Sequence, residues 1–538
     1  MRTRFVGLVL LFTFAFQTVF FAQTATKPNS PARKAAEGIT ADQLKDYLYF
    51  IADDAMQGRD TPSPGLDATA NFIAFHLKKW GYKPGGDNGT FLQKMWINQH
   101  NTDISASGAE ISGQKLVYGD DFFALPNSGT ASSSLVFGGN GWMHKGKGID
   151  PFAGIDVKGK IVVIYGNNGL PAGLTPADLQ PDKQYKEWAG PNGYAAMKGA
   201  AGLIYLTGSQ ANWERVRQQR EGGTITVEKL QDTTTVPILP TIYVSQKTAN
   251  YLFDGETGNP LTTADLKPFE LKGKKAAFTT AVRTERLPTQ NVVAIWEGSD
   301  PKLKNEMVAL GAHYDHVGTN PKVPGADKIF NGADDDGSGT TGILGIAEAL
   351  AKSKARPKRS VLFVWHCGEE RGLWGSLYFN KFPTVDIKQV IAQLNIDMIG
   401  RSKKIGDIEP GNKELSGENE IFVIGANMMS STLGKIVADT NTNYLKMTYD
   451  LRFDNLNDPN RFFFRSDHFN YAANGIPISF WFDGIHVDYH RVSDSPDKID
   501  YAKMEKVART IFLTMWELSG LKERPKIDKQ LPPELTQR

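Results

Sequence analysis

The chain has 538 residues, which is too long for a single hydrophobic core and predicts two or three domains. Its hydrophobic fraction of 40% is that of a globular protein in water, and its net charge of +2 argues against a strongly basic surface for nucleic acids or anionic membranes. Cys367 is the only cysteine, so an intrachain disulfide is impossible and a small disulfide-stapled fold is excluded.

The first 22 residues have the pattern of a secretory signal peptide. Arg2 and Arg4 precede an almost wholly apolar run over 5–22, and small or polar residues follow. Because the run approaches the length that spans a bilayer, a retained membrane anchor is the alternative. We expect cleavage, a secreted or periplasmic protein without a stable membrane anchor, and a mature net charge of 0, because the removed segment carries two arginines and no acid.

The next segment predicts a short leader followed by helices. Residues 23–38 are rich in Ala, Thr, Pro, Lys and Ser and predict a flexible leader. Residues 39–121 are expected to form the first part of the main domain. Thr40 and Gln43 have the spacing of a capping box, and apolar residues then recur at helical spacing. A second helix is expected over 67–80.

Residues 122–285 predict a separate β-rich domain. Short β-like runs alternate there with clusters of Gly, Pro and Asn. The runs lie at 134–137, 160–165, 202–206, 237–244 and 275–282. One helix is expected at 192–199. The segment has no cluster of acids and histidines that resembles a site, so its expected role is a lid or spacer that restricts substrate access.

Residues 286–525 predict an α/β fold with a mainly parallel mixed sheet that is flanked by helices. Apolar strands alternate there with helices, as in a sheet covered on both faces. The predicted strands are 292–296, 307–312, 361–366, 390–396 and 476–482. The predicted helices are 338–351, 371–381, 431–440 and 503–518. Residues 526–538 form a tail.

Five candidate metal ligands lie near the ends of these strands or at the start of a helix. They are His313, Asp335, Glu370, Asp397 and His490. Ligands of open α/β sheets bind beyond the C-terminal ends of the strands, so these side chains are expected to meet at one edge. Two histidines and three carboxylates suit a pair of borderline-hard divalent ions such as Zn²⁺. Glu369, next to Glu370, would supply a general base for an attacking water.

Neighbouring residues leave alternatives open. Asp334 and Asp336 flank Asp335, and either is an alternative ligand between the two ions. Cys367 lies close to the acid pair, but a free cysteine beside a buried strand usually acts as a small hydrophobe rather than a nucleophile. Four further histidines are expected to support the ligands, line the substrate or be structural: His316, His366, His468 and His486.

Six motifs resemble those of the M28 zinc exopeptidases, which include bacterial secreted aminopeptidases. They are H-Y-D at 313–315, G-A-D-D-D-G-S-G at 332–339, G-E-E-R-G-L-W-G-S at 368–376, N-I-D-M-I-G at 395–400, R-S-D-H at 465–468 and Y-H at 489–490. The resemblance covers 40–120, with its Gly58–Arg59 segment, and 286–520. The inserted region resembles a protease-associated (PA) domain in texture and position.

The resemblance implies how the ligands are shared. Asp335 would bridge two zinc ions. His313 and Asp397 would complete the coordination of one ion, and Glu370 and His490 would complete that of the other.

The resemblance also implies three supporting roles. Glu369 would be the general base and would later pass its proton to the leaving amine. Asp315 would orient His313 through the other ring nitrogen. Tyr489 would donate a hydrogen bond to the developing oxyanion.

The implied activity is removal of N-terminal residues from peptides by a dinuclear zinc aminopeptidase. A carboxypeptidase or dipeptidase on the same scaffold is the alternative, and it would need a cation for the substrate carboxylate. Three arginines lie near the motifs: Arg371, Arg401 and Arg465. A glutaminyl cyclase is disfavoured by the intact His313 and Asp315, and a non-catalytic scaffold by the complete ligand set. The specificity pocket is expected from loops 401–420 and 441–464.

Overall fold

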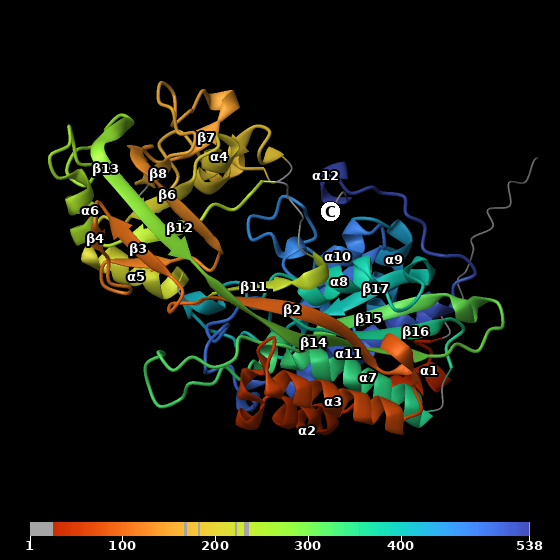
Figure 1. The fold of residues 1–538 in the computed structure, drawn as a ribbon. Helices are drawn as coiled ribbons and strands as arrows, with labels where there is room; N and C mark the ends of the chain where they lie inside the picture. Colours follow the sequence, from red (N-terminus) through yellow and green to blue (C-terminus); the bar gives the residue numbers. More distant parts are fainter. Residues whose placement is uncertain are drawn as a thin grey trace, which may run out of the picture. The chain divides into compact units, whose positions relative to one another are not determined.

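The computed structural model describes residues 25–165, 169–180, 183–220, 223–230, 236–353 and 356–536 (Figure 1). The chain divides into two compact units. The larger unit comprises residues up to Lys94 and from Thr289 onward, and the smaller unit is Met95–Pro288. The predicted signal peptide at 1–22 lies outside the described residues. Within the described ranges, no helix has the length and apolar character needed to cross a bilayer.

The larger unit is built on a mixed sheet with the strand order β14-β16-β15-β17-β20-β18-β19. The strands are β14 (Val282–Trp296), β15 (Met307–His313), β16 (Ser360–His366), β17 (Val390–Ile396), β18 (Glu420–Ile424), β19 (Thr448–Asp450) and β20 (Ile478–Phe482). The central strands β16, β15, β17 and β20 are parallel, whereas β14 and β18 pair antiparallel with their inner neighbours. The short β1 (Lys83–Pro84) adds to β14. The predicted α/β class with a mainly parallel mixed sheet is confirmed.

Helices cover both faces of this sheet. In Figure 1, α2, α3, α7 and α11 lie on one side of the strands, and α8 and α10 lie on the other. The helices of this unit are α1 (Pro31–Glu37), α2 (Ala41–Ile51), α3 (Pro64–Lys79), α7 (Gly339–Ser353), α8 (Trp374–Lys381), α9 (Ser431–Thr442), α10 (His468–Ala473), α11 (Tyr501–Gly520) and α12 (Pro533–Thr536). Because both faces are covered, β15, β16, β17 and β20 are buried along their whole length.

The N-terminal helices begin where their capping residues lie. Thr40 and Gln43 form the predicted capping box of α2. Ser63 caps α3, so this helix starts at Pro64 rather than at the predicted residue 67. The prediction of a flexible leader over 23–38 is wrong for its described part, because Ser30 caps α1 and the alanines of α1 pack in the core.

Short elements of the larger unit were missed by the sequence prediction. Strands β18 and β19 and helix α10 have few residues, so their periodicity is too brief to recognise. In the predicted tail at 526–538, Leu531 is buried in the same core as the strands.

The smaller unit is a β-rich domain, as predicted, with the strand order β4-β3-β13-β6-β8-β10-β12-β5. These strands are β3 (Gly108–Ile111), β4 (Gln114–Lys115), β5 (Phe122–Ala124), β6 (Gly129–Phe137), β8 (Ile161–Ile164), β10 (Gly202–Leu206), β12 (Thr241–Val244) and β13 (Phe269–Thr280). Its helices are α4 (Pro191–Met197), α5 (Gln210–Arg220) and α6 (Gln246–Phe253), of which only α4 was predicted. The short β7 (Met143–His144) and β9 (Trp188–Ala189) pair separately.

The predicted start of this domain at 122 is too late. Strands β3 and β4 precede residue 122 and join the domain's sheet through β13. The unit boundaries fall inside β2 (Leu92–Thr102) and β14, and β11 (Thr224–Val227) pairs with the later part of β2. The resemblance of this unit to a PA domain stays a prediction.

Candidate metal centre

The structure brings the five predicted ligands together at the C-terminal edge of the central strands. His313 is the last residue of β15, and Asp397 follows β17 directly. Glu370 lies four residues beyond β16, and His490 lies in the loop after β20. Asp335 lies in a short helical segment, η8 (Ala333–Ser338), that leads into α7. Sheet topology therefore assembles residues that are far apart in the sequence.

The two carboxylate oxygens of Asp335 face two different histidines. Its Oδ1 lies 3.3 Å from Nε2 of His313, and its Oδ2 lies 3.0 Å from Nε2 of His490. On the first side, Oδ2 of Asp397 is 3.6 Å from the His313 Nε2. On the second side, Oε2 of Glu370 is 3.0 Å from the His490 Nε2. Asp335 thus lies between two ligand groups, which is the position required of a bridging carboxylate.

These residues fit a pair of divalent cations. Nε2 of His313, Nε2 of His490, Oδ2 of Asp335 and Oε1 of Glu370 are buried without a hydrogen-bond partner. Buried polar atoms nearly always have one, so atoms that approach each other without it need another explanation. Tetrahedral zinc with bonds of about 2.0–2.2 Å would place neighbouring ligand atoms about 3.4 Å apart. The observed separations of 3.0–3.6 Å match that requirement.

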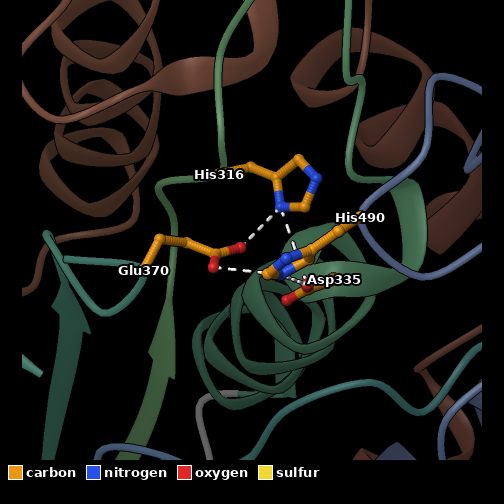
Figure 2. A group of neighbouring side chains, drawn as sticks. All are labelled: His316, Asp335, Glu370 and His490. Atoms are coloured by element: carbon orange, nitrogen blue, oxygen red, sulfur yellow. Dashed lines mark ion pairs between the residues drawn. The ribbon is translucent and has the colours of Figure 1, made fainter. Parts of the chain in front are cut away.

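His316 joins this centre, although the sequence prediction gave it no ligand role. Its Nδ1 lies 2.8 Å from Oε1 of Glu370 and 3.7 Å from Oδ2 of Asp335. Figure 2 shows the imidazole directed at these two carboxylates beside His490. The available signal was its place three residues after His313, but only the structure shows that the chain turns the ring inward.

Both carboxylate oxygens of Asp336 accept hydrogen bonds from the backbone. Its Oδ2 accepts a hydrogen bond from the N–H of His313 (3.1 Å), and its Oδ1 accepts from the N–H groups of Gly339 (2.8 Å) and Met398 (3.1 Å). These bonds tie the ends of β15 and β17 to the start of α7. Asp336 also has an oxygen within 4.8 Å of ligand atoms of His313 and Asp397. Because both its oxygens already accept backbone hydrogen bonds, it fits a structural role better than the bridge.

Asp334 and Asp494 hold the segment that carries Asp335. Asp334 accepts a hydrogen bond from the N–H of Gly400 (2.7 Å) and lies 3.2 Å from Nε2 of His486. Asp494 accepts from the N–H groups of Asp334 (3.0 Å) and Asp335 (3.2 Å) through one oxygen. Asp494 was missed by the sequence prediction, although it lies just beyond the last motif. Both carboxylates therefore position Asp335 from the protein side.

Glu369 lies at the same centre with the properties of a proton acceptor. Its Oε2 is 3.9 Å from Nε2 of His313. Burial raises the pKa of Glu369 well above its usual value, the charges of Glu370 and Asp397 add to this rise, and His313 opposes it. A carboxylate in such surroundings binds a proton readily, which suits a general base.

Asp315 supports His313 in a different way from the prediction. The Nδ1 of His313 lies 3.1 Å from the backbone carbonyl oxygen of Asp315 and 3.6 Å from its carboxylate. The carbonyl is therefore the nearer partner of the ring. The carboxylate of Asp315 instead accepts a hydrogen bond from the N–H of Glu369 (3.2 Å) and so connects the loops of ligand and base.

The carboxylate of Asp335 is held in its charged form by the imidazoles around it. Burial alone would raise the pKa of Asp335, but His313, His490 and His316 together hold it well below its usual value. Burial would lower the pKa of His490, but Asp335 and Glu370 raise it to about 10. A cation would replace these protons as the partner of the carboxylates.

A buried arginine fastens the loops that carry the ligands. Arg59 is fully buried, and its guanidinium donates hydrogen bonds to four backbone carbonyl oxygens. They belong to Ile51 (2.8 Å), Tyr314 (2.9 Å), Asn331 (2.7 Å) and Gly332 (2.8 Å). The Gly58–Arg59 motif of the sequence thus acts as a clamp on the segments that lead to His316 and Asp335.

A cleft opens onto the ligands from the side of Tyr489. Its lining combines Asp335, Glu369 and Asp397 with Arg465, Tyr489 and five apolar residues, Met398, Phe462, Phe480, Phe482 and Ile485. The Tyr489 ring stacks on His490 at 4.0 Å, and its hydroxyl oxygen accepts from Arg465 at 3.4 Å. Of the loops at 401–420 and 441–464, which were expected to build the specificity pocket, the second contributes Phe462 to this lining.

Two further histidines and the cysteine near the motifs have structural roles. Nε2 of His366 lies 3.2 Å from the hydroxyl of Tyr471, and Nε2 of His468 lies 2.8 Å from the carbonyl oxygen of Phe463. Burial lowers the pKa of both histidines to about 3, so both are neutral. Cys367 is buried, and burial raises the pKa of its thiol, which excludes it as a ready nucleophile.

Comparison with known proteins identifies the family of this region. Residues 291–515 match the model of peptidase family M28. This stretch of the chain resembles the M28 peptidases. The matched residues include every predicted metal ligand together with Glu369.

Curated relatives of this region are named as leucine aminopeptidases and as a leupeptin-inactivating enzyme. A probable leucine aminopeptidase of Arthroderma otae is 29% identical over 229 residues, which cover 41% of this chain and 56% of the relative. Leucine aminopeptidase 2 of Trichophyton rubrum is 27% identical over 271 residues, with coverage of 46% and 49%. The leupeptin-inactivating enzyme 1 of Streptomyces exfoliatus is 35% identical over 136 residues, with coverage of 24% and 28%. The chain therefore spans about half or less of the length of these relatives.

The fold as a whole also has a solved counterpart. An aminopeptidase from Aneurinibacillus sp. strain AM-1 matches with a TM-score of 0.52 and 18% identity. The match covers 92% of this chain and 98% of that protein. The two proteins share a fold.

Proposed function

We propose that this protein is a secreted, dinuclear zinc aminopeptidase that removes apolar residues from the N-termini of peptides. The observation that carries the proposal is the position of Asp335, whose two oxygens face two separate ligand groups beside Glu369. The M28 match and the names of the relatives support it. Secretion rests on the signal-like sequence at 1–22.

The ligands divide between two ions. His313 and Asp397 would hold one zinc ion, Glu370 and His490 would hold the other, and Asp335 would contact both. When bound, such a pair polarises the scissile carbonyl and makes a water acidic enough to react near neutral pH.

Glu369 performs the proton transfers. Its carboxylate accepts the proton of the attacking water and then delivers it to the nitrogen of the leaving peptide. A positioned base of this kind typically contributes about 10²–10⁴ in rate. Burial raises the pKa of Tyr489, so its hydroxyl keeps the proton and can donate to the oxyanion that develops in the cleft.

The cleft indicates which substrates bind. Asp335 and Asp397 would be neutralised by the ions, so Glu369 is the acid of the lining that remains to meet a free N-terminal ammonium group. The five apolar side chains of the lining would bury an apolar N-terminal residue, at about 25 cal/mol per Å² of apolar surface removed from water. The smaller, PA-like unit is proposed to restrict access to longer substrates.

Arg465 favours a second candidate, a carboxypeptidase or dipeptidase. Arg371 is paired with Asp60 at 2.6 Å, and Arg401 is paired with Asp488 at 2.6 Å. In the described part of the chain, no ion pair joins Arg465 to a carboxylate, and its side chain lines the cleft. It could therefore receive a substrate carboxylate.

A panel of peptides with blocked ends distinguishes these activities. Each peptide is incubated with the zinc-loaded protein in free, N-acetylated and C-amidated form, and products are followed by mass spectrometry. We expect sequential loss from free N-termini, no cleavage after N-acetylation and unchanged cleavage after C-amidation. The opposite dependence would establish the carboxypeptidase, and loss of ammonia from N-terminal Gln without cleavage would indicate a cyclase.

The Glu369→Gln variant is the control for the mechanism. The amide keeps the size of the side chain but cannot accept the proton, so turnover should fall by about 10²–10⁴ while bound zinc is unchanged. A zinc-replete variant with near-normal turnover would contradict the assignment of the base.

A further inference from the structure

We propose that His316 is a sixth protein ligand and binds, through Nδ1, the ion held by Glu370 and His490. This inference rests on the proposed dinuclear site and extends its set of five ligands. The Nδ1 of His316 approaches Oε1 of Glu370 at 2.8 Å and Oδ2 of Asp335 at 3.7 Å. His490 approaches the same two carboxylates from another direction, so four side chains surround one position (Figure 2).

The geometry is compatible with coordination of one shared cation. Glu370 offers Oε1 to His316 and Oε2 to His490, and each carboxylate oxygen of the pair faces a different imidazole. Neither Nδ1 of His316 nor Oε1 of Glu370 has a hydrogen-bond partner, despite the short distance between them. Zinc bonds of about 2.0–2.2 Å would place adjacent ligand atoms about 2.8–3.6 Å apart in five- or four-coordinate geometry. The distances of 2.8, 3.0 and 3.0 Å agree with this range, and 3.7 Å corresponds to a wider angle.

Because His316 is buried, leaving its ring nitrogens without a binding partner would cost free energy. Its side chain is 0% exposed, and Nε2 also has no hydrogen-bond partner. A buried polar group without a partner costs about 1–3 kcal/mol, which binding to a cation would offset. His486, which is equally buried, lies beside Asp334 and has no contact with the ligands of this ion in the described part of the chain.

Backbone contacts on both sides fix the position of the His316 ring. The N–H of His316 donates to the carbonyl oxygen of Arg59 at 3.2 Å, so the clamp that holds the loop also fixes the start of the side chain. The ring packs against Gly332, where an added Cβ would lie 2.5 Å from Cγ of His316. Gly332 has a φ of 56°, so a residue with a side chain would be both strained and in collision with the imidazole.

A consequence is that the two ions are held unequally. The ion near Glu370 would have two imidazoles, Glu370 and the bridge. The ion near His313 would have one imidazole, Asp397 and the bridge. Because imidazole is a stronger zinc ligand than water, the site with His316 is expected to fill first.

Zinc affinities of paired variants test the assignment without any peptide substrate. Each protein is titrated with zinc against a chelator of known affinity, and the apo form is melted to confirm folding. In His316→Asn, the amide nitrogen takes the place of Nδ1 and keeps a hydrogen bond to Glu370 while removing the imidazole. In His316→Ala both are removed. His468→Gln is the matched control at a buried histidine outside the site.

The expected result is that His316→Asn and His316→Ala both weaken the tighter ion by more than about 100-fold, which exceeds the 10–100-fold typical of residues that only support a ligand. The weaker ion should change little, and His468→Gln should match the wild type. If His316→Asn stays within about 10-fold of the wild type, the histidine only supports Glu370 and the inference is overturned.

X-ray absorption of the wild-type protein loaded with one zinc equivalent decides the case even if the variants fail to fold. Two imidazoles around that zinc support the inference, and one imidazole overturns it. A wild type that binds two ions but cleaves no peptide would refute the proposed function while leaving the role of His316 intact.

Discussion

The clamp formed by Arg59 predicts that one buried side chain controls both stability and metal binding. Arg59→Met keeps much of the aliphatic volume but removes every donor. Four buried carbonyl oxygens then lose their partner. At about 1–3 kcal/mol for each carbonyl, the free energy of unfolding could fall by at most about 4–12 kcal/mol. Because water and relaxation of the structure restore some hydrogen bonds to these carbonyl oxygens, we expect a loss of about 4 kcal/mol in the free energy of unfolding.

Metal affinity should fall together with stability. Two of the four carbonyls, at Tyr314 and Gly332, lie within three residues of the proposed ligands His316 and Asp335. Arg59 retains its charge near neutral pH, because burial lowers its pKa only to about 10 while nearby carboxylates oppose the shift. We therefore expect zinc affinity to fall by about 10–100-fold, as for other residues that orient ligands.

Arg359→Met is the matched control. Arg359 is also buried and bonds to Glu306 and to the carbonyl oxygens of Ser519 and Leu521, away from the metal ligands. Urea unfolding of the apo proteins measures stability, and chelator competition measures zinc affinity. Both variants should lose stability, but only Arg59→Met should lose affinity. If the free energy of unfolding of Arg59→Met falls by less than about 1 kcal/mol, or if the two variants bind zinc equally well, the role assigned to Arg59 is refuted.

Three further predictions follow from the site and its surroundings. His490→Ala should weaken the ion that Glu370 would also hold, and chelator competition that finds both ions bound as tightly as in the wild type would contradict its ligand role. Gly332→Ala should weaken zinc binding, because its methyl group collides with the His316 ring, and chelator competition would show affinity unchanged if this contact were unimportant. His366 and His468 have pKa values lowered to about 3 in the folded protein against about 6.5 in the unfolded chain, so the unfolded state takes up protons first as the pH falls. The stability they contribute is present above pH 6.5 and should be lost toward pH 3 at about 1.4 kcal/mol per pH unit for each histidine. Urea unfolding at pH 7 and pH 5 should show a smaller loss in His468→Gln than in the wild type, and equal losses would contradict the neutral state of this histidine.

The parts of the fold that the sequence predicts are those with strong local signals. The central strands read as continuous apolar runs because helices bury both of their faces, and the boundaries of β17 were predicted to the residue. Capping residues located α2 in the same way. By contrast, β18, β19 and α10 are too short to show a period, and their existence depends on the tertiary contacts of the larger unit.

The residues of the site likewise divide into those that the sequence predicts and those that it does not. The five ligands were predicted to meet because each lies at a strand end or helix start, and the structure brings them together. His316, Asp494 and the carbonyl of Asp315 were not assigned their contacts, because these depend on how loops turn after the strands. The lining of the cleft beside Tyr489, which comes largely from β20 and the segment at 462–466, depends on the same loop conformations.

The most direct test is a crystal structure of the zinc-loaded protein with anomalous scattering measured at the zinc absorption edge. Two peaks are expected, about 3.5–4 Å apart and on either side of Asp335. One should be bound by His313 and Asp397, and the other by Glu370, His490 and His316. A single peak, or two peaks that do not share Asp335, would contradict the dinuclear centre.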